Sequence, residues 1–150
     1  MSLQGRLAVV TGGASGIGKA TCHALASKGA RVFVADRNLD GAKDVAEALP
    51  GPATHKEAFL DVTKTESVDK LFADIKDTES IPLSIVVNFA GIAAMSPLVD
   101  TTDDEFDEII RVNLKVSVQT TTKKQNFPSL TPEVPALICG ALTQHLASPN

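Results

Sequence analysis

The stretch TGGASGIG, residues 11–18, decides the fold. It separates an apolar run over residues 6–10 from a segment with helical spacing that starts at Gly16 and ends before Gly29. Glycines in a turn between a strand and a helix let backbone N–H groups approach a pyrophosphate, and the helix N-terminus stabilises its negative charge. The stretch therefore predicts a strand–turn–helix unit that binds a nucleotide, with a purely structural glycine turn as the alternative.

Strand and helix patterns alternate outward from this turn. Buried strands are predicted at residues 6–10, 31–35, 56–60 and 83–87, and helices at residues 16–28, 39–49, 65–77 and from the capping box Thr102-x-x-Glu105 to Leu114. Such alternation indicates right-handed βαβ units and a parallel sheet covered on both faces. The sequence therefore predicts an α/β fold, a doubly wound parallel Rossmann sheet in the order 3-2-1-4, truncated after about four strands.

Composition excludes several classes of protein. The chain is 43% hydrophobic and 21% charged with a net charge of −4, which argues against a nucleic-acid partner. No run of about 18 apolar residues is present, so we expect no membrane span. The glycine turn follows the first apolar run at once, which favours a strand over a signal peptide. Cys22 and Cys139 give neither a disulfide framework nor metal-ligand spacing, so we expect no metal site and an intracellular location.

Asp36 ends the second predicted strand, about 20 residues after the glycine turn. A carboxylate there can hydrogen-bond the adenosine ribose hydroxyls and would repel a 2′-phosphate, which favours NAD over NADP. The adjacent Arg37 could instead pair with a 2′-phosphate, so NADP remains the less favoured cofactor. An Asp that merely caps a turn is the structural alternative.

Three later motifs complete a resemblance to a known family: Asp61-Val62, the stretch NFAG at residues 88–91, and VNL at residues 112–114. With the glycine turn and Asp36, they resemble the short-chain dehydrogenase/reductase family over residues 5–115. Residues 55–115 are most similar to the type 8 17β-hydroxysteroid dehydrogenases and the 3-oxoacyl-carrier-protein reductases. The resemblance implies NAD-dependent hydride transfer to or from an alcohol or ketone of the 3-hydroxyacyl or steroid class, in the cytoplasm or the mitochondrial matrix.

The resemblance also implies roles for single residues. It assigns Gly12, Ser15, Gly16, Ile17 and Gly18 to the pyrophosphate, Asp61 and Val62 to the adenine, and Asn88, Ala90 and Gly91 to the side of the cofactor. Phe89 replaces the family's usual second Asn, which we expect to affect local packing. Asn113 corresponds to the family's active-site Asn, which kinks a helix and holds a water in a proton relay. An Asn within an amphipathic helix is its structural alternative.

The family's Tyr-x-x-x-Lys is missing, because the chain contains no tyrosine. In the family this Tyr exchanges a proton with the substrate oxygen, which a Ser polarises. We expect no substitute among Lys123, Lys124, Ser129 and His145, and we expect His23 and His55 to be structural or exposed. The chain alone is therefore predicted to be an inactive fragment. The alternatives are a non-catalytic NAD-binding module and an unstable splice or gene-model product.

Residues 116–150 differ from residues 1–115, which form the predicted NAD-binding domain. They hold four of the eight prolines and three charged side chains, which predicts a mostly irregular tail. Lys115-Val116-Ser117 matches the translation of a typical exon end followed by an intron start. We therefore hypothesise retained intron sequence, which the genomic sequence across codon 115 tests.

A chain that ends its sheet at the fourth predicted strand would leave that strand as an edge. Exposed apolar edges invite pairing with another chain. The sequence therefore predicts homo- or hetero-oligomers formed through the edge of residues 83–87, in addition to a dinucleotide ligand.

Overall fold

The computed structural model describes residues 2–93, 98–115, 117–120 and 137–138. The strands are β1 (Leu7–Thr11), β2 (Arg31–Asp36), β3 (Lys56–Phe59), β4 (Leu83–Asn88) and β5 (Leu137–Ile138). The helices are α1 (Gly16–Ser27), α2 (Leu39–Ala48), α3 (Thr65–Thr78) and α4 (Asp103–Ile110), with the 3-10 turn η1 (Leu98–Asp100) and the π-helical turn η2 (Arg111–Lys115). The strand order β3-β2-β1-β4-β5, parallel throughout, confirms the predicted α/β sheet and its 3-2-1-4 order.

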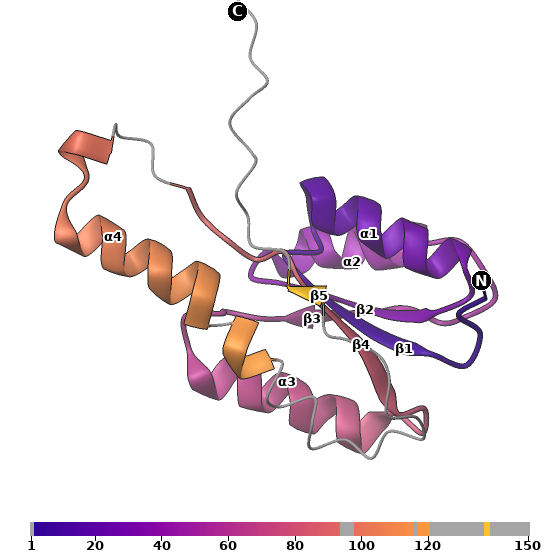
Figure 1. Cartoon of the computed structure of the whole chain (residues 1–150). Helices are drawn as coiled ribbons and strands as arrows, with labels where there is room; N and C mark the ends of the chain where they lie inside the picture. Colours follow the sequence, from indigo (N-terminus) through magenta and orange to yellow (C-terminus); the bar gives the residue numbers. More distant parts are fainter. Residues whose placement is uncertain (1, 94–97, 116, 121–136, 139–150) are drawn as a thin grey trace, which may run out of the picture.

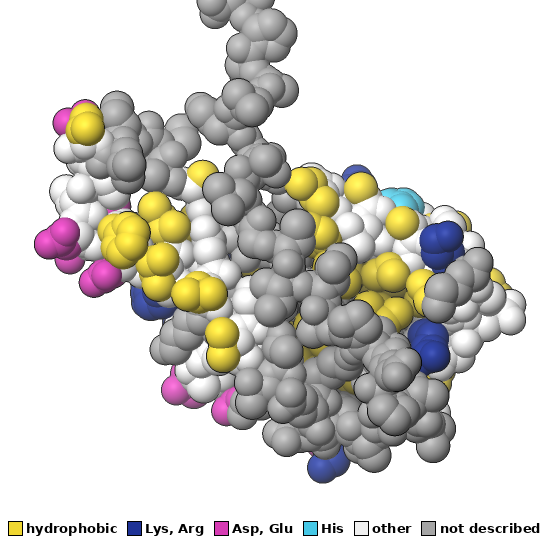
Figure 2. Space-filling model, in the orientation of Figure 1, with side chains coloured by type: hydrophobic (Ala, Val, Ile, Leu, Met, Phe, Trp, Pro, Cys, Tyr) yellow, Lys and Arg dark blue, Asp and Glu magenta, His cyan; other side chains and the backbone are white. Residues whose placement is uncertain are grey.

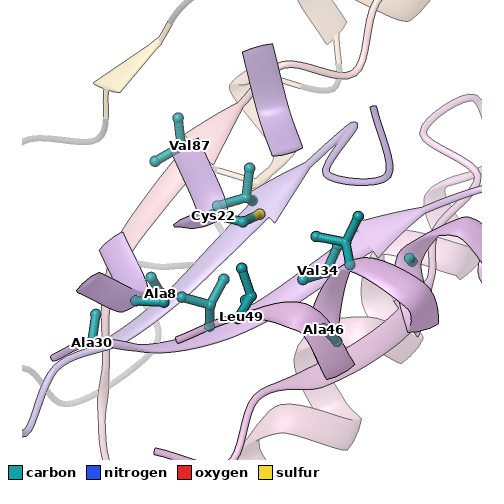
Figure 3. Close-up of a cluster of buried hydrophobic side chains, with 12 residues drawn as sticks. Ala8, Cys22, Ala30, Val34, Ala46, Leu49 and Val87 are labelled. Carbon is teal, nitrogen blue, oxygen red and sulfur yellow. The ribbon is translucent and has the colours of Figure 1, made fainter. Parts of the chain in front are cut away.

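The sheet is covered on both faces, with α1 and α2 on one side and α3 on the other (Figure 1). Successive residues of a strand point to opposite faces, and β1 divides accordingly. Ala8 and Val10 pack in the cluster beneath α1 and α2, which Figure 3 shows, whereas Leu7 and Val9 pack in the cluster that α3 completes. Two buried faces explain why β1, β2 and β4 read as nearly continuous apolar runs.

Cys22 belongs to the first of these clusters and is fully buried. Burial raises the pKa of its thiol to about 12, so it stays protonated at neutral pH. A protonated, buried thiol packs as a small hydrophobic side chain and is a poor nucleophile. Cys22 is therefore part of the core.

The expected open edge at β4 needs a correction. β5 pairs with the last two residues of β4, Val87 with Leu137 and Asn88 with Ile138. A helical turn at residues 117–120 likewise falls in the region that was expected to be irregular. A long-range contact holds this turn against the sheet, because the buried Thr120 hydroxyl donates to Asn88 Oδ1 at 2.9 Å. Within the described residues, the outer edge of β4 lacks a strand partner only before Val87.

α4 begins as predicted, with the Thr102–Glu105 capping box present in both directions. None of its residues is buried. Among the residues that the structure describes, no helix is both long enough and apolar enough to cross a membrane. Cys139 and the candidates Lys123, Lys124, Ser129 and His145 lie outside the described residues.

Candidate functional site

A cavity of about 340 Å³ opens where the carboxyl ends of the parallel strands meet. The chain passes from β1 to β2 on one side and later reaches β4 on the other, and ligands of doubly wound sheets bind at such a switch point. Most predicted site residues line it: Gly12, Ser15, Ile17, Gly18, Asp36, Arg37, Asp61, Val62, Ala90 and Gly91. The predicted residues Gly16, Asn88 and Asn113 are not part of the lining.

Close approach explains two glycines of the turn at residues 11–18. Gly12 has φ of +67°, and a Cβ on it would lie 2.7 Å from the Ala90 backbone nitrogen. A Cβ on Gly18 would overlap the Gly12 carbonyl oxygen. Gly16, at φ of +50°, is a second left-handed residue of the turn. At Gly12 and Gly18 only glycine allows the backbone to approach this closely, and at these two positions the turn presents backbone to the cavity.

The N-terminus of α1 opens on the same cavity through Ser15, Ile17 and Gly18. Ser15 is the N-cap residue, but its side chain makes no capping hydrogen bond, and the first turn holds no acidic residue. The N-termini of α2 and α4 are capped by the side chains of Asn38 and Thr102. The N-terminus of α3 also lacks a side-chain cap, but its first turn holds Glu66. Uncapped amides and the helix dipole together favour an anion at this position.

The Asp36 carboxylate is held by two backbone amides. Its Oδ2 accepts from the Ala14 nitrogen at 3.1 Å, and its Oδ1 accepts from the Asn38 nitrogen at 3.0 Å. Asp36 thereby joins the end of β2 to the glycine turn, and it is one of the residues that line the cavity. The neighbouring Arg37 is exposed and lines the cavity as well. The cavity is therefore lined both by Asp36, which favours NAD, and by Arg37, which could pair with the 2′-phosphate of NADP.

Asp61 follows β3 and is fixed by its neighbours. Its Oδ1 accepts from the Thr63 hydroxyl at 2.6 Å and from the Thr63 nitrogen at 3.0 Å, and Lys64 Nζ lies 3.4 Å from its Oδ2. The Thr63 hydroxyl, then the Thr63 amide and Lys64, lower the pKa of this carboxyl below its usual 3.8. Asp61 is therefore an oriented anion at neutral pH, with one oxygen turned away from Thr63.

Asn88 and the residues after β4 are fixed by the end of β1. The Thr11 hydroxyl accepts from the Ala90 nitrogen at 3.1 Å, and the Thr11 carbonyl accepts from the Phe89 nitrogen at 3.1 Å. Asn88 is buried behind them. Phe89 packs against the cluster beneath α1 and α2 and also lines the cavity, which agrees with the expected packing role.

Asn113 lies within the π-helical turn η2, a helix irregularity that is frequent at functional sites. Its Oδ1 accepts from the Ile92 nitrogen and its Nδ2 donates to the Ile92 carbonyl, both at 2.8 Å. Ile92 lines the cavity and Asn113 is not among its lining residues, so Asn113 positions part of the cavity wall. The Ser117 hydroxyl donates to the Asn113 carbonyl at 3.1 Å. The Asn113 carbonyl oxygen, which could otherwise hold a water, is thus hydrogen-bonded to a protein hydroxyl.

Sequence reasoning missed the cavity residues Leu60, Thr63, Ile92, Ala93, Glu108 and Val112, and the supporting role of Thr11. Thr63 had a local signal, because a Thr two residues after an Asp often closes a turn. Glu108 and Val112 had none, because they reach the cavity from α4 and η2. Within the described part of the chain, no group of three or more His, Cys, Asp and Glu side chains could hold a metal ion.

Comparison with known proteins places the chain among oxidoreductases. The short chain dehydrogenase family model matches residues 6–127. Sorbitol dehydrogenase of Cereibacter sphaeroides is 38% identical over 114 residues, which cover 76% of this chain and 43% of that enzyme. The 3-oxoacyl-acyl-carrier-protein reductase FabG of Salmonella typhimurium is 36% identical over 76% of this chain and 46% of its own length.

Solved structures agree. A short-chain type dehydrogenase/reductase from Mycobacterium marinum superposes with a TM-score of 0.76 at 30% identity, over 82% of this chain and 50% of that one. A hydroxysteroid dehydrogenase from Escherichia coli gives a TM-score of 0.73 at 26% identity, over 81% and 52%. The chain spans about half the length of the curated relatives it matches. The family match, which covers most of the chain, and the cavity at the switch point lead to one conclusion: the chain belongs to the short-chain dehydrogenase/reductase family.

Proposed function

We propose that this chain binds NAD through the adenosine and pyrophosphate half of the dinucleotide and catalyses no turnover by itself. The single observation that carries the proposal is the cavity at the carboxyl ends of β1 to β4, where the glycine turn meets the uncapped N-terminus of α1. Its volume of about 340 Å³ lies at the lower end of the range of about 300–1,000 Å³ for small-molecule pockets.

The described residues fit a dinucleotide in three adjoining places. Backbone amides around Ser15 suit the pyrophosphate, and the Asp36 carboxylate suits the adenosine ribose hydroxyls. Asp61, oriented by Thr63, suits the amino group of the adenine ring. The carboxylate at Asp36 also supports NAD over NADP, because it would repel a 2′-phosphate.

The nicotinamide of bound NAD supplies hydride chemistry in the complete family enzymes. In them, the substrate oxygen also exchanges a proton with a tyrosine phenol, and these 150 residues contain no tyrosine. Oxidation of an alcohol or reduction of a ketone, of the 3-hydroxyacyl or steroid class, would therefore need a phenol and a lysine from outside this sequence. We also propose that the chain is related to the type 8 17β-hydroxysteroid dehydrogenases. The activity of that class would likewise need a phenol and a lysine from outside this sequence.

Binding without turnover is the expected result when purified protein is titrated with NADH and assayed with 3-oxoacyl and steroid substrates. The protein has no Trp and no Tyr, so enhancement of NADH emission can be followed with little protein background. We expect saturable enhancement together with a rate equal to that of a buffer control. Turnover that survives repurification would contradict the absence of a proton donor, and a lack of any binding would favour an unstable product over a binding module.

We also propose that the chain associates with a second polypeptide. The outer edge of β4 before Val87 has no strand partner within the described residues. In addition, Phe106, Ile110, Leu114 and Val118 recur every four residues and are 54%, 41%, 56% and 56% exposed. Figure 2 shows hydrophobic side chains gathered over the α4 region. Light scattering after gel filtration should give a mass above that of one chain, whereas a stable monomer would contradict association.

Two further points stay proposals. The compartment is intracellular, either cytoplasm or mitochondrial matrix, because the two cysteines suggest no disulfide framework. The dinucleotide-binding domain spans residues 1–115 and residues 116–150 form a divergent tail. The family match continues to residue 127, twelve residues beyond this proposed boundary.

A further inference from the structure

His55 lies at the opposite end of β3 from the cavity and completes the pairing of β3 with β2. The β2–β3 register starts with Phe33 opposite Lys56, so β3 offers no backbone acceptor to the preceding Val32 amide. His55 Nδ1 accepts this amide at 3.2 Å, and Val32 is fully buried. The imidazole thus takes the place of a backbone carbonyl at the start of the strand pair.

The two contacts of the imidazole define its protonation state. A backbone N–H can only donate, so His55 Nδ1 must be the unprotonated nitrogen. The proton then resides on Nε2, which lies 3.3 Å from the Pro50 carbonyl and donates to it. The folded protein therefore requires the neutral Nε2–H tautomer of His55. A proton on Nδ1 would remove the only acceptor that the structure shows for the Val32 amide.

The charges around His55 also oppose a second proton. Arg31 on β2 and Lys56 on β3 each form an ion pair of 2.8 Å with Glu79, which follows α3 and whose side chain is 1% exposed. α2 contacts both β2 and β3, and its Lys43 and Glu47 lie 3.9 Å apart in an exposed ion pair. The positive charge of Arg31 therefore disfavours a second proton on the His55 imidazole.

β3 links this end of the sheet to the cavity. It has four residues, and β2 is its only strand neighbour within the described residues. Beyond Phe59, the Leu60 nitrogen donates to the Asp36 carbonyl at 3.0 Å, and Asp61 to Thr63 then form one wall of the cavity. A short edge strand that loses a bond at its start is less firmly fixed at its end.

We propose that His55 is a pH-sensitive latch: protonation of Nδ1 releases the Val32 amide, loosens β3 against β2 and lowers the affinity of the cavity for dinucleotide in acid. The affinity part of this inference rests on the proposed function, whereas the stability part does not.

The lowered pKa of His55 determines how the stability of the fold depends on pH. Burial, and then the charge of Arg31, lower the pKa of His55 below its usual 6.5, against a smaller opposing effect of the hydrogen bond to Pro50. Below about pH 6.5 the unfolded chain binds a proton that the folded chain does not bind. Stability is therefore full above that pH, falls as the pH drops through it, and levels off below the folded pKa.

The variant His55→Asn can keep the hydrogen bond from the Val32 amide while removing the titratable imidazole. Asn Oδ1 is as many bonds from the backbone as His Nδ1, so it can accept the Val32 amide without binding a proton. His23→Asn is the matched control, because His23 lies on α1 and takes no part in the β2–β3 pairing. Melting temperature, followed by far-UV circular dichroism, and NAD affinity are measured for the three proteins from about pH 8 to about pH 5.

We expect the wild-type protein and His23→Asn to lose thermal stability in parallel as the pH falls, and His55→Asn to lose less. Their NAD affinity should fall by about threefold over the same range while that of His55→Asn changes less. Nitrogen-detected NMR of the wild-type imidazole gives a test that no variant can confound, and it should show the Nε2–H tautomer and a pKa below 6.5 for His55.

Equal pH slopes for the wild-type protein and His55→Asn, or a protonated Nδ1 at neutral pH, would overturn the latch. Stability that depends on His55 together with NAD affinity that does not would overturn its link to the cavity. If none of the proteins binds NAD at neutral pH, the proposed function fails, and the melting temperatures and the NMR titration still decide whether His55 is a latch.

Discussion

Gly12→Ala should weaken NAD binding by about 100-fold, which corresponds to about 2.7 kcal/mol, and should also destabilise the fold. A non-glycine residue at φ of +67° costs about 1–2 kcal/mol. The added Cβ would lie 2.7 Å from the Ala90 nitrogen and 2.8 Å from the Phe89 carbonyl carbon, and both are backbone atoms that cannot rotate away. The residues after β4 must then move, at a typical cost of about 1–3 kcal/mol for overpacking.

Gly5→Ala is the matched control for this prediction. Gly5 also has a left-handed φ, +72°, but a Cβ there would meet no atom within 4 Å. Gly5→Ala therefore measures the cost of a left-handed alanine without any steric clash. Gly5 is also not among the residues that line the cavity. We expect Gly5→Ala to bind NAD like the wild-type protein and to melt between the wild-type protein and Gly12→Ala. If both variants bind equally well, the close approach of the glycine turn to Ala90 has no role in binding.

Asp36→Asn should shift the preference for NAD over NADP by about tenfold toward NADP. The carboxylate is fixed by the amides of Ala14 and Asn38, so its charge cannot move away from a 2′-phosphate. A tenfold shift equals about 1.4 kcal/mol. For two charges about 5 Å apart this lies between about 0.8 kcal/mol in bulk water and about 3.3 kcal/mol at the effective dielectric constant of a protein surface. Removal of the charge leaves Arg37, on the cavity wall, free to favour the phosphate.

Asp40→Asn provides the control for net charge. Asp40 lies in the first turn of α2, is exposed and does not line the cavity. Parallel titrations with NAD and NADP should give the wild-type ratio for Asp40→Asn and the shifted ratio for Asp36→Asn only. An identical ratio in both variants would mean that Asp36 caps the turn without selecting the cofactor.

The sheet could be predicted because its signals are local. Apolar runs that end at a small or polar residue located β1, β2 and β4 within a residue or two, and Thr102 with Glu105 marked the start of α4. β3 was the weakest of the strands in the sequence. Its burial alternates along Lys56–Phe59, as suits an edge strand, and its pairing depends partly on a histidine side chain.

The contacts that could not be predicted join residues far apart in the sequence. Asn113 reaches Ile92 across 21 residues, and Thr120 reaches Asn88 across 32. No periodicity encodes such side-chain bridges, because each depends on how η2 and the following turn pack against the end of β4. The same limit explains why the helical turn at residues 117–120 and the short strand β5 were not expected.

Amide chemical-shift mapping of the isotope-labelled chain during titration with NAD tests the proposed binding site most directly. We predict saturable shifts at the amides from Gly12 to Gly18, at Asp36, at Asp61 and Val62, and at Ala90 and Gly91, with Glu79 at the far end of the sheet unchanged. Shifts confined to other surfaces, or none at saturating NAD in a folded sample, would contradict binding in this cavity.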